Sequence, residues 1–174
     1  IFSNSGQVCV AGSRLFAHKS IFDSVLEGMA QTAGFWAPRA SLDPEGHMGP
    51  LVSKEQHDRV MGYIEAGKRD GASVVMGGDV PTSPGGYYVN PTILADVNPQ
   101  MSVVREEIFG PVVVAQRFED LDEVAKMAND TCYGLGAGVW IKDVSAMHWL
   151  ASRIKSGTVW GNCHAVIDTA LPFG

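Results

Sequence analysis

The 174-residue sequence has few cysteines, and they stand apart from one another. Cys9, Cys132 and Cys163 are widely spaced, and no two of them form a C-x-x-C pair. An odd number of isolated cysteines argues against a disulfide framework and against a zinc knuckle, and it is typical of a reducing compartment. We therefore expect a cytoplasmic protein without a metal site.

Clustered positive charge and long apolar segments are also scarce. The chain has 13 Lys and Arg against 19 Asp and Glu, a net charge of -6. No Lys/Arg cluster is dense enough to suggest a nucleic-acid interface. No apolar run reaches the length of about 20 residues that spans a bilayer, and the N-terminus lacks the pattern of a signal peptide. These absences predict a protein that binds neither nucleic acid nor membrane.

The two ends of the chain lack the polar character of natural termini. The sequence begins at Ile1 without an initiator methionine and stops within the apolar segment Leu171–Gly174. With 45% hydrophobic residues, the chain can form one domain with a real core but hardly two. We expect one domain over residues 1–174 that is incomplete at both ends and belongs to a longer protein.

Apolar, β-branched stretches alternate along the chain with stretches of helical periodicity. The predicted strands are 14–17, 73–76, 111–115, 138–141 and 157–160, and a strand or hairpin is predicted at 87–94. Helices are predicted after an N-cap at Ser20, after the capping box Ser53–Gln56, after Asp120 and near Val144, with loops at 36–52 and 77–86. This alternation indicates βαβ units and therefore an α/β fold, with a mostly parallel sheet and helices on both faces in three αβα layers.

Cys9 lies among small residues in the segment 4–14, NSGQVCVAGSR. A nucleophilic thiol needs access, stabilisation of the thiolate and donors for the oxyanion that it creates. The glycines and other small residues nearby would let a ligand carbon approach Cys9 closely. A free cysteine is, however, often a small buried hydrophobe, as we expect for Cys132 and Cys163. Local composition alone leaves both interpretations of Cys9 open.

Three segments resemble signatures of the NAD(P)-dependent aldehyde dehydrogenase superfamily, in the same order. Residues 2–14 (FSNSGQVCVAGSR) resemble its active-site cysteine signature, and residues 105–111 (REEIFGP) its E-E-x-F-G-P cofactor segment. Residues 156–162 (SGTVWGN) and 171–174 (LPFG) resemble its C-terminal stretch. Because the connecting sequence also aligns, the resemblance covers essentially the whole chain.

The resemblance implies a catalytic-domain fragment in which Cys9 is the nucleophile. In that family the thiolate attacks an aldehyde, a hydride passes to the nicotinamide, and water hydrolyses the thioester. Glu107 would hydrogen-bond the nicotinamide ribose, and Phe109 would pack beside the nicotinamide ring. The cofactor would be NAD, with NADP not excluded. The alternatives are a solvated acidic pair for Glu106 and Glu107 and core packing for Phe109.

The resemblance also extends to residues outside the signatures. Gln56 and Arg59 fall where the family often has a Gln and a Lys near the cofactor ribose, although an exposed helix face explains both equally well. Asn162 matches an asparagine that we expect to hold backbone together.

The expected aldehyde site is apolar. The positions that match the lining of the family's aldehyde tunnel are Val8, Val10, Ile167 and Phe173. They predict an apolar or aromatic aldehyde, as for the phenylacetaldehyde-type dehydrogenases of that family. Val8 and Val10 could equally well pack the loop.

Several parts of the family pattern are absent from this sequence. They are the Rossmann-type glycine turn, the E-L-G-G-K segment with the general-base glutamate, the oxyanion asparagine and the C-terminal oligomerisation strand. We expect the full-length protein to supply these parts. We also expect it to take an aldehyde as substrate and to form a homo-oligomer. Two other classes remain open: a Cys–His hydrolase, in which His164 could reach Cys9, and a non-catalytic relative.

Overall fold

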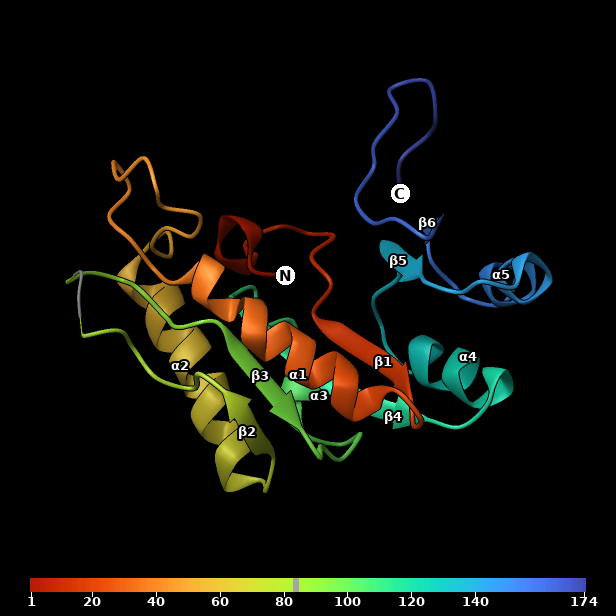
Figure 1. The fold of residues 1–174 in the computed structure, drawn as a ribbon, viewed down its shortest axis with the longest axis horizontal. Coiled ribbons are helices and arrows are strands. Elements are labelled where there is room, and N and C mark those ends of the chain that lie inside the picture. The colour runs from red at the N-terminus through yellow and green to blue at the C-terminus, as the bar shows by residue number, and fades with distance from the viewer. Residues whose placement is uncertain (83–84) are drawn as a thin grey trace. The chain divides into compact units, whose positions relative to one another are not determined.

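The computed structural model describes residues 1–82 and 85–174 of the chain (Figure 1). These residues form two compact units. The N-terminal unit comprises residues 1–8 and 13–117, and the C-terminal unit comprises residues 9–12 and 118–174. The sequence predicts one domain over residues 1–174, whereas the strands form two sheets, one of four strands and one of two.

The sheet of the N-terminal unit has the strand order β1-β4-β3-β2. Its strands are β1 (Arg14–His18), β2 (Ser73–Met76), β3 (Thr92–Ala95) and β4 (Val112–Phe118). β3 and β4 pair in parallel, with Thr92 opposite Val112 and Leu94 opposite Val114, and β2 is antiparallel to β3. The predicted strand over 87–94 is therefore shorter and begins later. The predicted loop 77–86 includes residues 83 and 84, which lie outside the described residues.

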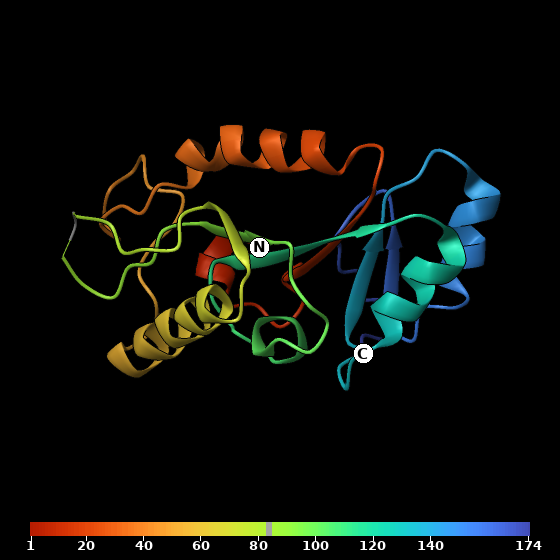
Figure 2. The same cartoon turned by 90° about the horizontal axis from the view of Figure 1, so that it is seen from below.

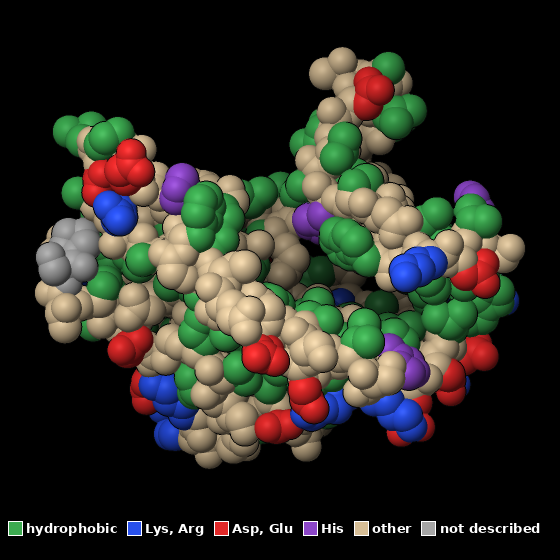
Figure 3. All heavy atoms as spheres, in the orientation of Figure 1, with side chains coloured by type: hydrophobic (Ala, Val, Ile, Leu, Met, Phe, Trp, Pro, Cys, Tyr) green, Lys and Arg blue, Asp and Glu red, His purple; other side chains and the backbone are tan. Residues whose placement is uncertain are grey.

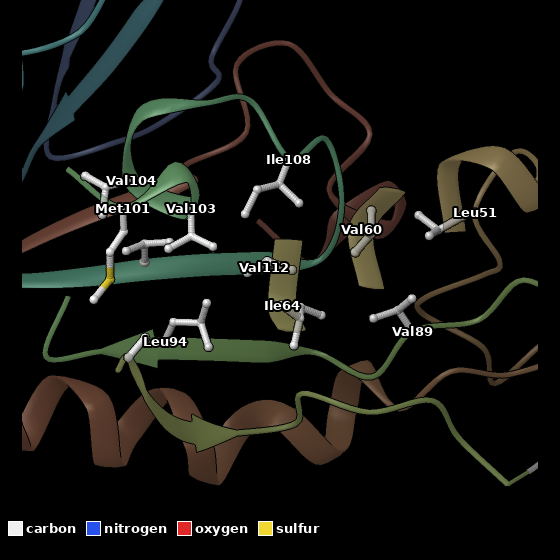
Figure 4. Packing of buried hydrophobic residues seen from close by; sticks show 12 residues of the cluster. Leu51, Val60, Ile64, Val89, Leu94, Met101, Val103, Val104, Ile108 and Val112 are labelled. Carbon is white, nitrogen blue, oxygen red and sulfur yellow. The ribbon is translucent and has the colours of Figure 1, made fainter. Parts of the chain in front are cut away.

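Alternating side chains on β3 and β4 supply two separate cores, because successive residues of a strand point to opposite faces. Leu94, Val112 and Val114 pack with helices α2 (Lys54–Arg69) and α3 (Ser102–Arg105). Figure 4 shows Leu94 and Val112 in this cluster. Ile93, Ala95, Val113 and Ala115 pack instead with α1 (Phe22–Thr32). Figure 2 shows α1 on one side of this sheet and α2 with α3 on the other. The predicted three-layer αβα arrangement is confirmed.

The start of α2 follows the predicted capping sequence, but only in part. The Ser53 side chain accepts a hydrogen bond from the Gln56 backbone N–H at 3.2 Å, which caps the helix. A complete capping box would also return the Gln56 side chain to Ser53, and here it binds elsewhere. The prediction of Ser20 as an N-cap is wrong. The cap of α1 is Ile21, and Ser20 Oγ bonds His18 Nδ1 at 2.7 Å.

The C-terminal unit contains a parallel strand pair joined through a helix. β5 (Gly136–Val139) pairs with β6 (Thr158–Gly161), and α5 (Val144–Ala151) lies between them in the chain. Asp120 caps α4 (Leu121–Asn129) through the Glu123 N–H at 2.8 Å, as predicted. β5 begins two residues before the predicted strand at 138–141.

Short elements complete the description. They are the 3-10 turns η1 (Ser3–Gly6) and η2 (Ala33–Trp36). The stretch predicted to be irregular, 36–52, is irregular from residue 37 onward, because Trp36 ends η2, and it contains an isolated bridge between Pro38 and Met48. Within the described part of the chain, no helix combines the length and the apolar character that crossing a membrane would require.

Candidate active site

The chain enters the cysteine segment through a strained turn in the N-terminal unit. Asn4, Ser5 and Gly6 have φ values of 50°, 55° and 70°, three successive residues in the left-handed region. Such residues persist only where surrounding contacts hold them. Ser5 Oγ donates to Gly49 O at 2.7 Å, and Gln7 Oε1 accepts from the backbone N–H of Val52 at 2.9 Å. The approach to the cysteine is therefore fixed by contacts with residues 49–52.

Two glycines bring the cysteine segment against the segment 105–111. A Cβ added at Gly6 would lie 1.9 Å from the carbonyl oxygen of Gly110. A Cβ added at Gly110 would lie 2.5 Å from Val60 Cγ2 on α2. Neither position has room for a side chain. The backbone at Gly6 therefore approaches that of Gly110 directly, while Gly110 packs against the Val60 side chain on α2. Gly6 in the cysteine segment thus allows close backbone packing. From the sequence alone, we expect the glycines of this segment to let a ligand approach Cys9.

Cys9 itself lies at the surface of the C-terminal unit, and the two residues on either side of it are less exposed. Val8 is half-buried and Cys9 is exposed, while Val10 is only 7% exposed. Val10 Cγ1 would lie 3.3 Å from a Cβ built on Gly136 of β5, so this valine packs against that strand. Cys9 therefore meets the access requirement of a nucleophile, and the packing of Val10 favours the alternative in which it stabilises the loop.

The two other cysteines are not buried as predicted. Cys132 is exposed and Cys163 is half-buried in this chain. Cys132 follows the end of α4, and Cys163 follows β6. Exposure alone therefore does not distinguish Cys9 from Cys132, and the surrounding signature does.

Gln56 and Arg59 hold the segment 106–109 against α2. The Gln56 side-chain amide donates to the carbonyls of Ile108 and Phe109, at 3.1 and 2.9 Å. One turn further along the same helix face, the Arg59 guanidinium donates to the carbonyl of Glu107 at 3.0 Å. Three successive carbonyls thus accept hydrogen bonds from two side chains of one helix. We call this arrangement the α2 clasp.

A tyrosine that sequence reasoning missed extends the α2 clasp. Tyr63 Oη accepts from Arg59 at 3.1 Å and donates to Glu106 Oε2 at 2.7 Å. The Arg59 guanidinium also lies 5.1 Å from the centre of the Tyr63 ring. The i, i+4 spacing of Arg59 and Tyr63 was the available signal, since such residues are neighbours on a helix. Glu106 is therefore tied to α2, and the solvated-pair alternative does not describe it.

The α2 clasp presents Glu107 and Phe109 at the surface of the N-terminal unit. Both residues are exposed, and Phe109 has 37% of its surface accessible. Phe109 has a φ of 55°, an uncommon conformation for a bulky residue. Its carbonyl is held by Gln56, while Ile108 beside it is 4% exposed in the core. The core-packing alternative for Phe109 is not supported, because the ring stays accessible.

On the same turn of α2, charged side chains pair with one another. Lys54 and His57 both contact Asp58, and the hydrogen bond from Lys54 is the main cause that lowers the pKa of the Asp58 carboxyl. These ion pairs are exposed and contribute little to stability. They leave the attachment of segment 106–109 to Gln56, Arg59 and Tyr63.

The remaining predicted substrate residues lie in the C-terminal segment. Ile167 is 63% exposed and Phe173 is 47% exposed. Figure 3 shows hydrophobic side chains at the surface of this segment, which runs to the C-terminus. The indole nitrogen of Trp160 donates to Val166 O at 2.7 Å and anchors the segment to β6. Both predicted residues are thus accessible in this chain, and neither is part of a core.

Asn162 holds backbone together, as expected. Its side-chain Oδ1 accepts from the backbone N–H of Ile141 at 2.9 Å, and its own N–H donates to Val139 O at 2.8 Å. Asn162 therefore links the ends of β5 and β6 in the C-terminal unit.

His164 is committed to a backbone carbonyl. Its Nε2 lies 2.6 Å from Val10 O, while its Nδ1 is buried without a hydrogen-bond partner among the described residues. A catalytic Cys–His pair would direct a ring nitrogen at the thiol. The ring instead bonds the carbonyl of Val10, the residue after Cys9, which removes the support for the hydrolase alternative.

In the described part of the chain, no group of three His, Cys, Asp or Glu side chains is placed to hold a metal ion. The glycine pair Gly77–Gly78 lies in the turn after β2, and among the residues described between it and β3 there is no helix. Gly77 packs against the Pro91 carbonyl, where a Cβ would come within 2.1 Å. These glycines therefore serve a turn, and they do not form a phosphate-binding loop, which requires a helix N-terminus behind it.

Taken together, an α/β fold, a cysteine on an accessible loop and a clasped E-E-I-F-G-P segment define the aldehyde dehydrogenase class. Residues 1–174, the whole chain, match the aldehyde dehydrogenase family. The chain belongs to this family.

Individual relatives agree with the family match. The chain is 48% identical to DhaS of Bacillus subtilis and 42% identical to the phenylacetaldehyde dehydrogenase of Pseudomonas fluorescens, over 174 and 175 residues respectively. Each alignment covers 100% of this chain and 35% of the relative. The chain therefore spans about a third of the length of these curated relatives.

Solved structures give the same result for the fold. An NAD+ complex of an aldehyde dehydrogenase from Bacillus cereus matches with a TM-score of 0.96 and 44% identity, over 100% of this chain and 35% of that one. An indole-3-acetaldehyde dehydrogenase in complex with NAD+ also matches with a TM-score of 0.96, at 43% identity and the same coverage. The backbone arrangement described above is thus that of aldehyde dehydrogenases.

Proposed function

We propose that this chain forms part of the catalytic domain of an enzyme that oxidises an aldehyde to a carboxylate, with Cys9 as the nucleophile. Membership of the aldehyde dehydrogenase family supports the reaction class. The single observation that carries the assignment of Cys9 is its exposed position within the family's cysteine signature.

In the proposed reaction, the Cys9 thiolate forms a carbon–sulfur bond with the aldehyde carbon and gives a thiohemiacetal. NAD supplies the acceptor for the hydride that leaves this carbon, so that a thioester remains on Cys9. Water then cleaves the carbon–sulfur bond, releasing the carboxylate and returning the thiol. The glutamate that activates this water in the family matches no segment of this chain.

The α2 clasp fits one wall of a dinucleotide site. The exposed carboxylate of Glu107 has the acceptor oxygens that two ribose hydroxyls require, and the accessible ring of Phe109 can pack beside the nicotinamide. Gln56 and Arg59 fix the backbone that carries both side chains. We therefore propose that Glu107 and Phe109 contact the cofactor, and that Gln56 and Arg59 act by positioning them. NAD is favoured because the matched structures are NAD+ complexes.

The substrate is proposed to be an apolar or aromatic aldehyde. The residues available for it, Val8, Ile167 and Phe173, are apolar and at least partly accessible, while Val10 is committed to packing. Similarity to a phenylacetaldehyde dehydrogenase supports the same class of substrate. By the same family resemblance, the full-length enzyme is proposed to be a homo-oligomer, and its isolated cysteines favour the cytoplasm.

Trapping the acylated enzyme tests this function. The intact enzyme is mixed with phenylacetaldehyde and NAD, quenched in acid and digested, and the cysteine-containing peptides are weighed by mass spectrometry. We expect a phenylacetyl mass increase on the peptide that contains Cys9. An adduct on the Cys132 or Cys163 peptide in its place, or rapid turnover with Cys9 never acylated, would contradict the proposal.

A further inference from the structure

The peptide one residue beyond the nucleophile, between Val10 and Ala11, is held by a histidine from the other end of the chain. His164 Nε2 lies 2.6 Å from the carbonyl oxygen of Val10, across 154 residues of sequence. Both residues belong to the C-terminal unit, as does Cys9. Because the carbonyl and the following N–H lie in one peptide plane, this contact fixes the orientation of the peptide between Val10 and Ala11.

The partner of His164 determines which ring nitrogen carries the proton. A peptide carbonyl can only accept, so Nε2 must be the donor, and the neutral imidazole then has a bare acceptor at Nδ1. This Nδ1 is buried without a partner among the described residues. The hydrogen bond to the Val10 carbonyl therefore places a proton on Nε2.

The surroundings of the ring leave it little freedom. The Trp160 ring lies 5.0 Å from the His164 ring at 66°, and the Trp140 ring lies 6.1 Å away at 33°. A Cβ built on Gly138 would come within 2.9 Å of Nδ1, so the absence of a side chain there makes room for the imidazole. A ring that is held on three sides can orient the carbonyl that it contacts.

The Val10 side chain is anchored to the same unit, since it packs toward Gly136 of β5 and is 7% exposed. Side chain and carbonyl of this one residue are thus fixed by different groups. Cys9, directly before it, has no such enclosure and is exposed. The arrangement holds one flank of the thiol rigid while it leaves the thiol accessible.

We propose that His164 is a positioning residue for Cys9, which acts through its Nε2–H donated to the Val10 carbonyl. This inference rests on the proposed role of Cys9 as nucleophile and adds a residue that the family signatures do not include. His164 takes no part in proton transfer. Its contribution is to hold the peptide between Val10 and Ala11, and through Val10 to keep Cys9 in the orientation from which the thiolate attacks.

Variants of the intact enzyme at position 164 separate the hydrogen bond from the ring's shape. His164→Phe keeps an aromatic ring beside Trp160 and removes the donor together with the unpartnered Nδ1. His164→Gln keeps an N–H donor at the end of a side chain, and His164→Met has a similar length without one. His148→Gln, at an exposed position on α5, is the matched control. Each variant is assayed for kcat and KM with phenylacetaldehyde and NAD, for the thermal unfolding temperature, and for alkylation of Cys9 by iodoacetamide, followed on its peptide.

We expect His164→Phe to lower kcat by about 10- to 100-fold, the range that a misplaced reacting group costs. Its unfolding temperature and the alkylation rate of Cys9 should stay near those of the parent, because the thiol itself is unchanged. His164→Gln should retain most of the turnover, His164→Met should lose it, and His148→Gln should behave as the parent.

Turnover of His164→Phe at the parent rate would overturn the proposal, as would equal turnover of His164→Gln and His164→Met. If His164→Phe does not fold, the comparison of His164→Gln with His164→Met tests the proposal. Failure of the proposed function is distinguishable, because the parent enzyme would then show no acylation of Cys9 in the trapping experiment.

Discussion

Replacing Gln56 with alanine removes the two hydrogen bonds that its amide donates to the carbonyls of Ile108 and Phe109. The cap of α2 survives this change, because Ser53 accepts from the backbone N–H of residue 56. The substitution therefore loosens the segment that carries Glu107 and Phe109 without altering how the helix begins.

The size of the effect follows from the bonds that are lost. A hydrogen bond between neutral groups contributes about 0.5–1.5 kcal/mol, so two contribute about 1–3 kcal/mol. A free-energy change of that size shifts an equilibrium by about 5- to 150-fold. Phe109 is held at a φ of 55°, a conformation that costs energy. This strain favours release of the segment once the hydrogen bond to the Phe109 carbonyl is lost. Arg59 still bonds Glu107 O, and Gly6 still packs against Gly110, so we expect the lower end of the range, about five- to tenfold in kcat.

The assay is steady-state kinetics of the intact enzyme at saturating aldehyde with NAD varied, together with thermal unfolding. Gln31→Ala is the control, because the exposed amide of Gln31 on α1 donates one bond, to Glu27 Oε1 at 3.2 Å. We expect Gln56→Ala to lower kcat while Gln31→Ala changes nothing. A raised KM for NAD at unchanged kcat would refute the positioning argument and identify Gln56 as a direct cofactor contact.

Two further substitutions test the same region. Glu107→Gln should slow hydride transfer more than it weakens NAD binding, because it removes charge only from the acceptor nearest the reacting carbon; unchanged turnover with a greatly raised KM for NAD would contradict this. Gly6→Ala should lower the unfolding temperature, because the left-handed conformation alone costs a residue with a Cβ about 1–2 kcal/mol and the new atom would lie 1.9 Å from Gly110 O. The control variant Gly28→Ala, at an exposed position on α1 where an added Cβ meets nothing within 4 Å, should not lower the unfolding temperature. Equal decreases in unfolding temperature in the two variants would count against the close packing of Gly6.

The layers of the fold could be predicted from the sequence because they depend on local patterns. The alternation of Ile93 and Leu94, or of Val112 and Val113, decides which side chains meet α1 and which meet α2. The cap at Ser53 is local in the same sense, since donor and acceptor are three residues apart. Ser20 shows the limit of such patterns, because a competing partner at His18 takes its hydroxyl.

The candidate site could be predicted in its residues but not in their contacts. The signature around Cys9 and the segment at Glu107 are visible in the sequence. The hydrogen bonds from Gln56, in contrast, reach carbonyls that lie 52 and 53 positions further along the chain. The contact between His164 and Val10 spans 154 positions. Side-chain donors of this kind choose among many backbone carbonyls, and only the folded backbone decides which of them lie within reach.

The measurement that tests the central claim most directly is a single-turnover experiment on the intact Cys9→Ala variant. Enzyme in excess over phenylacetaldehyde is mixed rapidly with NAD, and NADH absorbance is followed, with NAD affinity measured separately. If Cys9 forms the bond to the aldehyde, the burst of NADH is absent while NAD binds as tightly as to the parent. A burst of normal rate and amplitude in Cys9→Ala would contradict the account.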